Sequence, residues 1–177
     1  SPIRNRKRIE GGRMAVSISN RQRRVRIGLR TLKRRAGELL ASLQSADDSL
    51  DLAIVGDRAM RKINRTFRGH AETTDVLSFT PTPGGEPENL TGAGTGSDFW
   101  PARGFLGEVV ISIDQALIQA SEDAFSFEKA FERLLIHGVL HLKGFDHGNP
   151  REAARMRRRE KKLQAGLWKA APPHYIG

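Results

Sequence analysis

Residues 137–147 read His-Gly-Val-Leu-His-Leu-Lys-Gly-Phe-Asp-His and hold three of the five histidines of the chain. His137 and His141 are four residues apart, so on a helix their side chains project from the same face. Gly144 follows where a helix can end with a residue at positive φ, which lets the chain turn and bring His147 back toward the first two. Three neutral imidazoles form a typical zinc site that leaves a fourth position for water. The stretch therefore predicts a helix, a turn and one zinc ion per chain, held by these three histidines with nitrogen–metal distances near ~2.1 Å.

The rest of the composition limits what else could hold a metal. The chain contains no cysteine, which excludes disulfide frameworks, thiol catalysis and zinc sites built on thiolates. Any metal must therefore be held by histidine or carboxylate side chains.

The histidine spacing is also that of metzincin proteases, whose motif is H-E-x-x-H-x-x-G-x-x-H. The glutamate of that motif is the general base, and Gly138 stands in its position. At about 100° per residue, position 138 falls in an apolar helical stripe with Phe131 and Leu142, where a small residue permits close packing. The metal geometry of a zinc hydrolase is thus predicted without the proteolytic base. A metzincin-like metalloprotease remains a disfavoured alternative.

Outward from the predicted helix over 127–142, hydrophobic patterns of strands and helices interleave along the chain. Residues 81–104 hold six glycines and four prolines among twenty-four positions, which predicts a long loop. Interleaved strands and helices predict an α+β fold, that is, a mixed α/β sheet flanked by helices in a single domain. Strands are expected over 14–19 (an edge strand), 50–56, 76–79 and 105–113, and helices over 29–45, 57–67, a short segment from Asp114, and 152–163.

Two local details of these helices are also predicted. Asp57 and Asp114 are each expected to cap the helix that they introduce, because an aspartate oxygen can accept from the first free N–H groups. In the helix over 29–45, leucines share one side, and the basic side chains are expected to project away from it. These basic residues are Lys33, Arg34 and Arg35.

The net charge of +10 is concentrated at one end of the chain. Residues 1–35 carry thirteen Lys or Arg and one acid, whereas residues 36–177 carry seventeen bases and nineteen acids. Such a segment favours a polyanion, because each phosphate contact releases a counterion; a merely solvated tail is the alternative. No apolar run approaches the ~18 residues that span a bilayer, so no membrane partner is expected. We expect a basic N-terminal tail (1–13), one domain (14–170) and a C-terminal tail (171–177).

With Leu140, Leu142 and Asp146, the 137–147 motif closely resembles the H-G-x-L-H-L-x-G-[YF]-D-H signature of the YbeY family of bacterial endoribonucleases and ribosomal RNA maturation factors. Two features depart from the family pattern. Glu108 stands where the family usually has aspartate, and the 81–104 loop is longer and richer in glycine. The other matches, over residues 50–165, are Ile63–Arg68 with L-N-x-x-[YF]-R, Thr74–Phe79 with T-D-V-L-S-F, Leu106–Ser112 with L-G-D-I-x-I-S, and Met156 and Glu160 with a closing M-x3-E helix.

The resemblance implies a zinc-dependent, single-strand-specific endoribonuclease of the cytoplasm that matures the 3′ end of 16S ribosomal RNA and serves ribosome quality control. It implies single-stranded or ribosomal RNA and the small ribosomal subunit as partners, and ribosomal proteins and assembly GTPases as further ones. At the matching positions, Arg68, His137 and His141 are the implied catalytic residues. A guanidinium suits a phosphate because its planar fork donates two hydrogen bonds and stays charged. The alternative for Arg68 is a helix-terminal arginine that meets the macrodipole, and the alternative function is a zinc-containing ribosome-assembly factor without catalysis.

Three further expectations concern charged residues. Asp146 is expected to orient a histidine or to fix the turn. In the helix over 152–163, Arg155, Arg158 and Lys162 share a face that could track an RNA backbone, although a solvated face is equally compatible. Residues 1–35 contain no aromatic side chain, so this basic segment is expected to add affinity for RNA without sequence preference.

Overall fold

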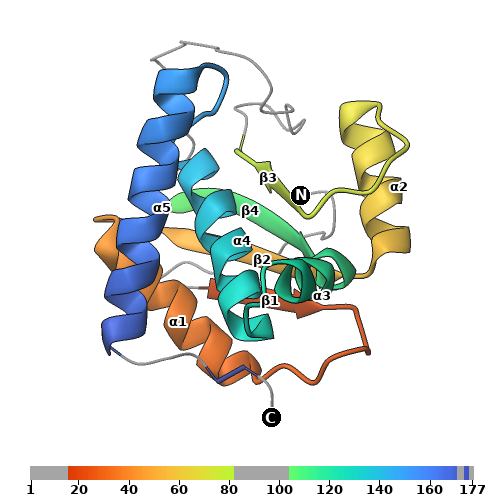
Figure 1. The fold of residues 1–177 in the computed structure, drawn as a ribbon, viewed down its shortest axis with the longest axis horizontal. Helices are drawn as coiled ribbons and strands as arrows, with labels where there is room; N and C mark the ends of the chain where they lie inside the picture. The colour runs from red at the N-terminus through yellow and green to blue at the C-terminus, as the bar shows by residue number, and fades with distance from the viewer. Residues whose placement is uncertain (1–15, 82–103, 171–173, 176–177) are drawn as a thin grey trace.

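The structure is a computed structural model of the 177-residue chain that describes residues 16–81, 104–170 and 174–175. The expected N-terminal tail and nearly all of the expected 81–104 loop lie outside the described residues. In the described part, a mixed sheet is flanked by helices on both faces, which confirms the predicted α+β class (Figure 1). Within these residues, no helix combines the length and the apolar character needed to cross a membrane.

The sheet has four strands in the order β1-β2-β4-β3. β1 (Val16–Asn20), β2 (Ser49–Val55) and β4 (Phe105–Ser112) run parallel to one another, whereas β3 (Val76–Phe79) pairs with β4 in the antiparallel sense. β1 lies at one edge, as its alternating pattern predicts. The central strands β2 and β4 are buried along nearly their whole length, because helices cover both faces of the sheet.

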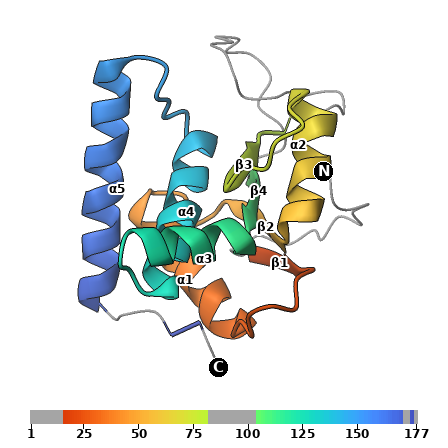
Figure 2. The same ribbon diagram turned by 45° about the vertical axis from the view of Figure 1, so that its right-hand side comes forward.

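The helices are divided unequally between the two faces. Seen nearly along the sheet, α2 lies on one side by itself among the described helices, and the other four lie on the opposite side (Figure 2). Their bounds are α1 (Leu29–Ser42), α2 (Asp57–Arg68), α3 (Ile113–Glu122), α4 (Phe127–Leu142) and α5 (Pro150–Ala170).

Alternate residues of the strands fill two separate cores. Leu52 and Ile54 of β2 belong to the larger core with α1, α4 and α5. Ala53 and Val55, which alternate with them, belong to the smaller core, where Met60 of α2 is fully buried. The smaller core therefore fixes α2 against the sheet, and with it the end of α2 that carries the predicted phosphate-binding arginine.

α5 is longer than the predicted segment 152–163. It begins at Pro150, directly after Asn149, whose side-chain oxygen accepts from the N–H groups of Arg151 and Glu152 at 3.0 Å each. Leu163 and Leu167 are buried four residues apart, so the apolar face continues past the predicted end. The prediction stopped seven residues short, about two turns, because Gln164, Ala165 and Gly166 interrupt the apolar pattern.

The predicted capping roles of Asp57 and Asp114 are wrong in detail. The residue before α2 is Gly56, which has no capping side chain, and the cap of α3 is Ser112. Asp114 instead accepts from the backbone N–H of Asp57 at 2.7 Å, so it satisfies the start of the other helix. Burial would raise the pKa of Asp57, but hydrogen bonds to its carboxylate, first from Ser112 and next from Gln115, lower that pKa overall.

Arg35 departs furthest from the predicted solvent-facing position, because its side chain is only 2% exposed. Its Nε donates to a carboxylate oxygen of Glu132 on α4 at 2.5 Å. The indole N–H of Trp168 on α5 donates to the other oxygen of Glu132, and the hydroxyl of Tyr175 lies 3.4 Å from the first. A buried charge persists only when it is paired. This pair therefore ties α1, α5 and the segment around Tyr175 to the helix that carries the histidines.

Candidate metal and phosphate site

The three histidines of the motif lie at the end of α4 and in the turn that follows it. α4 begins after Ser126, whose hydroxyl oxygen accepts from the N–H of Lys129 at 3.2 Å. After α4 ends, Gly144 has a φ of +83°, and the N–H of Phe145 donates to the carbonyl oxygen of Leu140 at 3.0 Å. The chain therefore turns back on the helix end, as the glycine spacing predicts.

Gly138 is the point at which α4 touches the sheet. A Cβ atom at this position would lie 2.6 Å from Cγ1 of Val109 and 3.0 Å from Cγ2 of Val76. The hydroxyl of Ser78 on β3 donates to the carbonyl oxygen of Gly138 at 2.8 Å, which links the sheet to α4. The predicted close packing is confirmed. A glutamate at position 138, the base of a metzincin, has no room here without displacement of the sheet.

The structure brings the three predicted ligands together. One ring nitrogen from each of His137, His141 and His147 lies within 4.8 Å of the other two. The Nε2 atoms of His137 and His141 are 3.0 Å apart, and the rings of His141 and His147 have centroids 5.1 Å apart. His137 and His141 are half-buried, whereas His147 is exposed. Over residues 16–81 and 104–170, this is the one group of three or more histidine or carboxylate side chains that could hold a metal ion.

The protonation of the cluster also suits a cation. Nδ1 of His137 lies 2.5 Å from a carboxylate oxygen of Glu160. With its Nδ1 proton directed at that carboxylate, His137 presents the Nε2 lone pair to the cluster. Burial, and then the charges of His137 and His147, lower the pKa of His141 to about 4, so its ring is neutral at pH 7. Neutral imidazole is the form that ligates a metal.

The distances between the three ring nitrogens also suit a single metal ion. A tetrahedral ion with bonds of about 2.1 Å holds its ligand atoms about 3.4 Å apart, and the three ring nitrogens already lie within 4.8 Å of one another. The three side chains therefore suit one divalent ion such as zinc.

Glu160 is the site residue for which sequence reasoning found no role. It lies on α5, twenty-three residues after the histidine that it contacts. The available signal was its position in the closing M-x3-E segment, one turn after Met156, which is buried in the core. That spacing indicates that Glu160 faces inward, but it does not identify the partner.

Asp146 holds the turn after α4 in place and does not orient a histidine ring. Its carboxylate accepts from the backbone N–H of His147 at 2.7 Å, whereas the nearest ring nitrogen of His147 is 3.9 Å away. Of the two predicted roles, the structure supports the turn.

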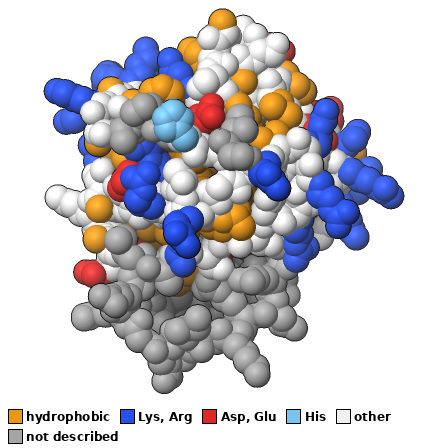
Figure 3. All heavy atoms as spheres, turned by 90° about the horizontal axis from the view of Figure 1, so that it is seen from below, with side chains coloured by type: hydrophobic (Ala, Val, Ile, Leu, Met, Phe, Trp, Pro, Cys, Tyr) orange, Lys and Arg blue, Asp and Glu red, His pale blue; other side chains and the backbone are white. Residues whose placement is uncertain are grey.

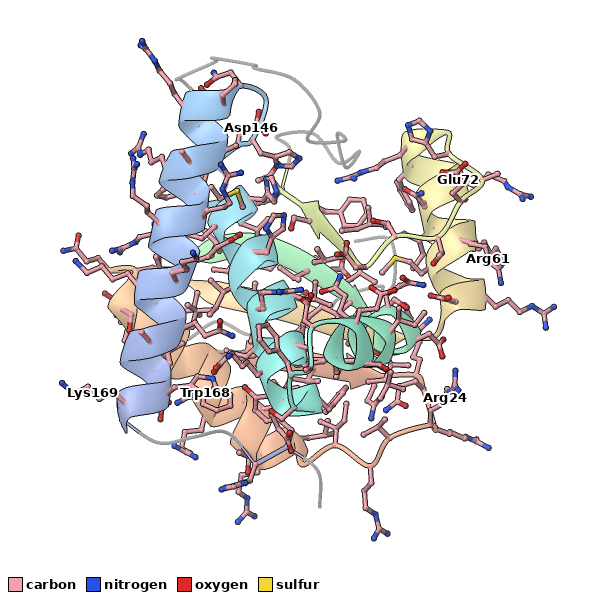
Figure 4. The ribbon with its side chains drawn as sticks, in the orientation of Figure 1. Arg24, Arg61, Glu72, Asp146, Trp168 and Lys169 are labelled. Carbon is pink, nitrogen blue, oxygen red and sulfur yellow. The ribbon has the colours of Figure 1, made fainter. Side chains whose placement is uncertain are left out.

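Arg68 is the last residue of α2, which ends at Gly69 with a φ of +70°. Burial lowers the pKa of Arg68, and the charge of Asp75 opposes this shift. The positive charge of Arg68 contributes to the lowered pKa of His141, so the guanidinium lies within electrostatic reach of the cluster. Asp146 and Glu72, which follow α4 and α2, lie at the same end of the molecule (Figure 4). A cation therefore lies within electrostatic reach of His141.

Glu108, the departure from the family pattern, does not join this cluster. It is buried on β4 in register with Asp51 of β2. Val110, two residues along the same strand, belongs to the core beneath α2. The carboxylate of Glu108 therefore faces away from the sheet surface that carries α4.

Comparisons with known proteins identify the family to which most of the chain is similar. The family model described as Endoribonuclease YbeY matches residues 17–167. The chain is 40% identical over 151 residues to Endoribonuclease YbeY of Anaeromyxobacter sp. (strain Fw109-5), covering 85% of this chain and 70% of that one. It is 36% identical over 156 residues to Endoribonuclease YbeY of Geobacter sulfurreducens, covering 87% and 96%. Its fold resembles the solution structure of TM1509 from Thermotoga maritima, with a TM-score of 0.58 over 88% of this chain and 91% of that one, at 23% identity.

Proposed function

The chain belongs to the YbeY family of endoribonucleases, and from this premise we propose that it is a zinc-dependent, single-strand-specific endoribonuclease that matures the 3′ end of 16S ribosomal RNA. The observation that carries the proposal is the cluster of His137, His141 and His147, with ring nitrogens within 4.8 Å of one another. Arg68, within electrostatic reach of His141, adds a cation for the phosphate.

In this proposal the three histidines hold the ion, which when bound would supply Lewis-acid chemistry at the phosphate and acidify water. Glu160 keeps His137 in the tautomer whose Nε2 faces the ion, because its carboxylate accepts the Nδ1 proton. Arg68 binds the non-bridging oxygens of the scissile phosphate and offsets the negative charge that develops there. Asp146 holds the turn, so that His147 stays on the side of the other two ligands.

A metalloprotease and a non-catalytic ribosome-assembly factor are the two alternative functions. A metalloprotease would need a general base beside the first histidine, and the contact of Gly138 with Val109 leaves no space for one. A ribosome-assembly factor with a structural zinc would need the fourth metal position closed. His147 is exposed rather than enclosed, which favours a site open to substrate.

The test compares three substrates with zinc-loaded protein: single-stranded RNA, the same RNA as a duplex, and casein. We expect cleavage of the single strand, little of the duplex and none of casein. His141→Ala should abolish both cleavage and zinc binding, whereas His174→Ala, which removes an exposed histidine, should change neither. Casein cleavage would favour the protease. Stoichiometric zinc without cleavage of any substrate would favour the assembly factor.

The proposal extends to partners and to the organisation of the chain. An enzyme that matures 16S ribosomal RNA acts in the cytoplasm on the small ribosomal subunit, with ribosomal proteins and assembly GTPases beside it. The catalytic domain would span residues 14–170, with the basic segment 1–13 as an RNA-binding tail. Tyr175, in the proposed C-terminal tail, nevertheless packs on the ring of Phe131 with centroids 5.7 Å apart, so part of that tail supports the domain.

A further inference from the structure

The outer face of α2 carries a row of basic side chains. Arg58, Arg61, Lys62 and Arg65, together called the α2 ridge here, are all exposed. Figure 4 shows Arg61 projecting from α2 on the side away from the sheet. Seen from below, Lys and Arg side chains gather along the margin of the molecule on the side where α2 and the segment around Arg24 lie in Figures 1 and 4 (Figure 3).

The α2 ridge forms one continuous arc that ends at Arg68. At about 100° per residue, its four residues and Arg68 fall within about 120° of the helix circumference. Apart from the adjacent Arg61 and Lys62, neighbours in the row are three or four residues apart, which places their Cβ atoms about 5–6 Å from each other. Ten residues at 1.5 Å each separate Arg58 from Arg68, so the row is about 15 Å long. The row runs along α2 to the half-buried Arg68, whose charge reaches His141.

No described carboxylate forms a salt bridge with any member of the α2 ridge. The one acidic residue of α2 is Asp57, and its carboxylate is already engaged by Thr73, Ser112 and Gln115. Some exposed arginines elsewhere are paired, as Arg34 is with Glu38.

Helix stability does not account for the row. Like charges three or four residues apart destabilise a helix. Arg58 also lies in the first turn of α2, where the macrodipole disfavours a cation. The arrangement therefore suits an external row of negative charges.

We propose that the α2 ridge binds consecutive phosphates of single-stranded RNA and leads the strand to Arg68 and the histidine cluster. This inference rests on the proposed function and adds a substrate path to it. The ridge itself contains no aromatic side chain on which a base could stack, so the contacts are to the backbone and carry no sequence preference. The linear spacing fits a flexible strand, which can follow a helix from one charge to the next.

The test removes three charges from the α2 ridge and three from a distant helix. The first variant is Arg61→Gln/Lys62→Gln/Arg65→Gln. The matched control, Arg157→Gln/Lys161→Gln/Lys169→Gln, removes three exposed charges from α5. Lys169 lies at the far end of α5 from Asp146 (Figure 4). Glutamine keeps helix propensity close to that of lysine and arginine, so both variants should fold.

Affinity for a 20-nucleotide oligouridine is measured from 50 to 200 mM salt in a His141→Ala background, which binds without cleaving. Three lost phosphate contacts should lower the slope of log affinity against log salt by about 0.7 × 3 ≈ 2 for a single strand. The drop in affinity across this fourfold salt range should then be about 16 times smaller than in the parent protein. The α5 control should keep the parent slope.

Each outcome separates the α2 ridge from the proposed catalysis. A lower slope in the ridge variant alone supports the path, even if the active protein cleaves no RNA. Equal slopes in parent and ridge variant overturn it, even if cleavage is intact, and would leave an acidic protein surface as the partner of α2. Equal losses in both variants would also overturn it, because they would report net charge rather than a path.

Discussion

Replacing Gly138 with alanine tests whether α4 sits on the sheet as closely as the structure describes. The new Cβ would lie 2.6 Å from one methyl group of Val109 and 3.2 Å from the other. Val109 is fully buried, and a β-branched side chain cannot rotate away from the contact. Overpacking of this kind costs about 3 kcal/mol, at the upper end of the usual range. Alanine recovers about 1 kcal/mol of helix propensity, so the net loss of unfolding free energy should be about 2 kcal/mol.

Gly166→Ala in α5 is the matched control, because nothing lies within 4 Å of the Cβ that it would add. The same substitution there should stabilise the protein by about 1 kcal/mol through helix propensity alone. Both variants are measured by urea unfolding of the metal-free protein, with fits that allow the denaturant slope to vary.

A double mutant identifies the cause of the loss. Val109→Ala removes the methyl groups that the new Cβ meets, so Gly138→Ala should cost about 2 kcal/mol less in its presence than in the parent. If Gly138→Ala instead stabilised the protein as much as Gly166→Ala does, α4 would stand further from the sheet than described. The sheet would then leave room for a glutamate at position 138.

Three other predictions concern the metal, the phosphate and the tail. Glu160→Gln should weaken zinc binding by about 10- to 100-fold in a chelator competition; Glu152→Gln, on the exposed side of the same helix, should not, and equal affinities would show that Glu160 does not support His137. Arg68→Ala should leave zinc content and unfolding unchanged but slow RNA cleavage by about 10²–10³; unchanged rates would make Arg68 a helix-end residue. Deletion of residues 1–13, which hold five of the thirteen N-terminal bases, should lower the slope of log RNA affinity against log salt. An identical slope would show that the tail does not contact RNA.

The features that sequence predicted best are those set by neighbours within a few residues. The histidine pair depends on the helical period, the turn on Gly144, and the packing of Gly138 on the apolar stripe of its own helix. Each of these follows from backbone geometry that a short window contains. For the same reason the alternating strands were found with their bounds within about two residues of the observed ones.

The features that sequence missed depend on partners far along the chain. Arg35 looked like a solvent-facing residue because its partner, Glu132, lies ninety-seven residues away. Glu160 could not be joined to His137 without knowing that α5 packs beside α4. Asp57 and Asp114 occupy helix starts as expected, but the hydrogen bond runs between the two helices rather than within either. The sequence around a charged side chain does not identify a partner that is distant along the chain.

These distant contacts also divide the metal site into a rigid part and an adjustable part. His137 and His141 stand on a helix fixed by the Gly138 contact with the sheet and by the buried carboxylate of Glu132. His147 has a side chain that is 62% exposed, and its place depends on the turn held by Asp146. The fold therefore fixes two ligands in place. The conformational entropy lost when the third ligand is ordered on metal binding depends on the turn. Changes in the turn should alter metal affinity with little effect on unfolding of the metal-free protein, whereas changes around Gly138 should alter both.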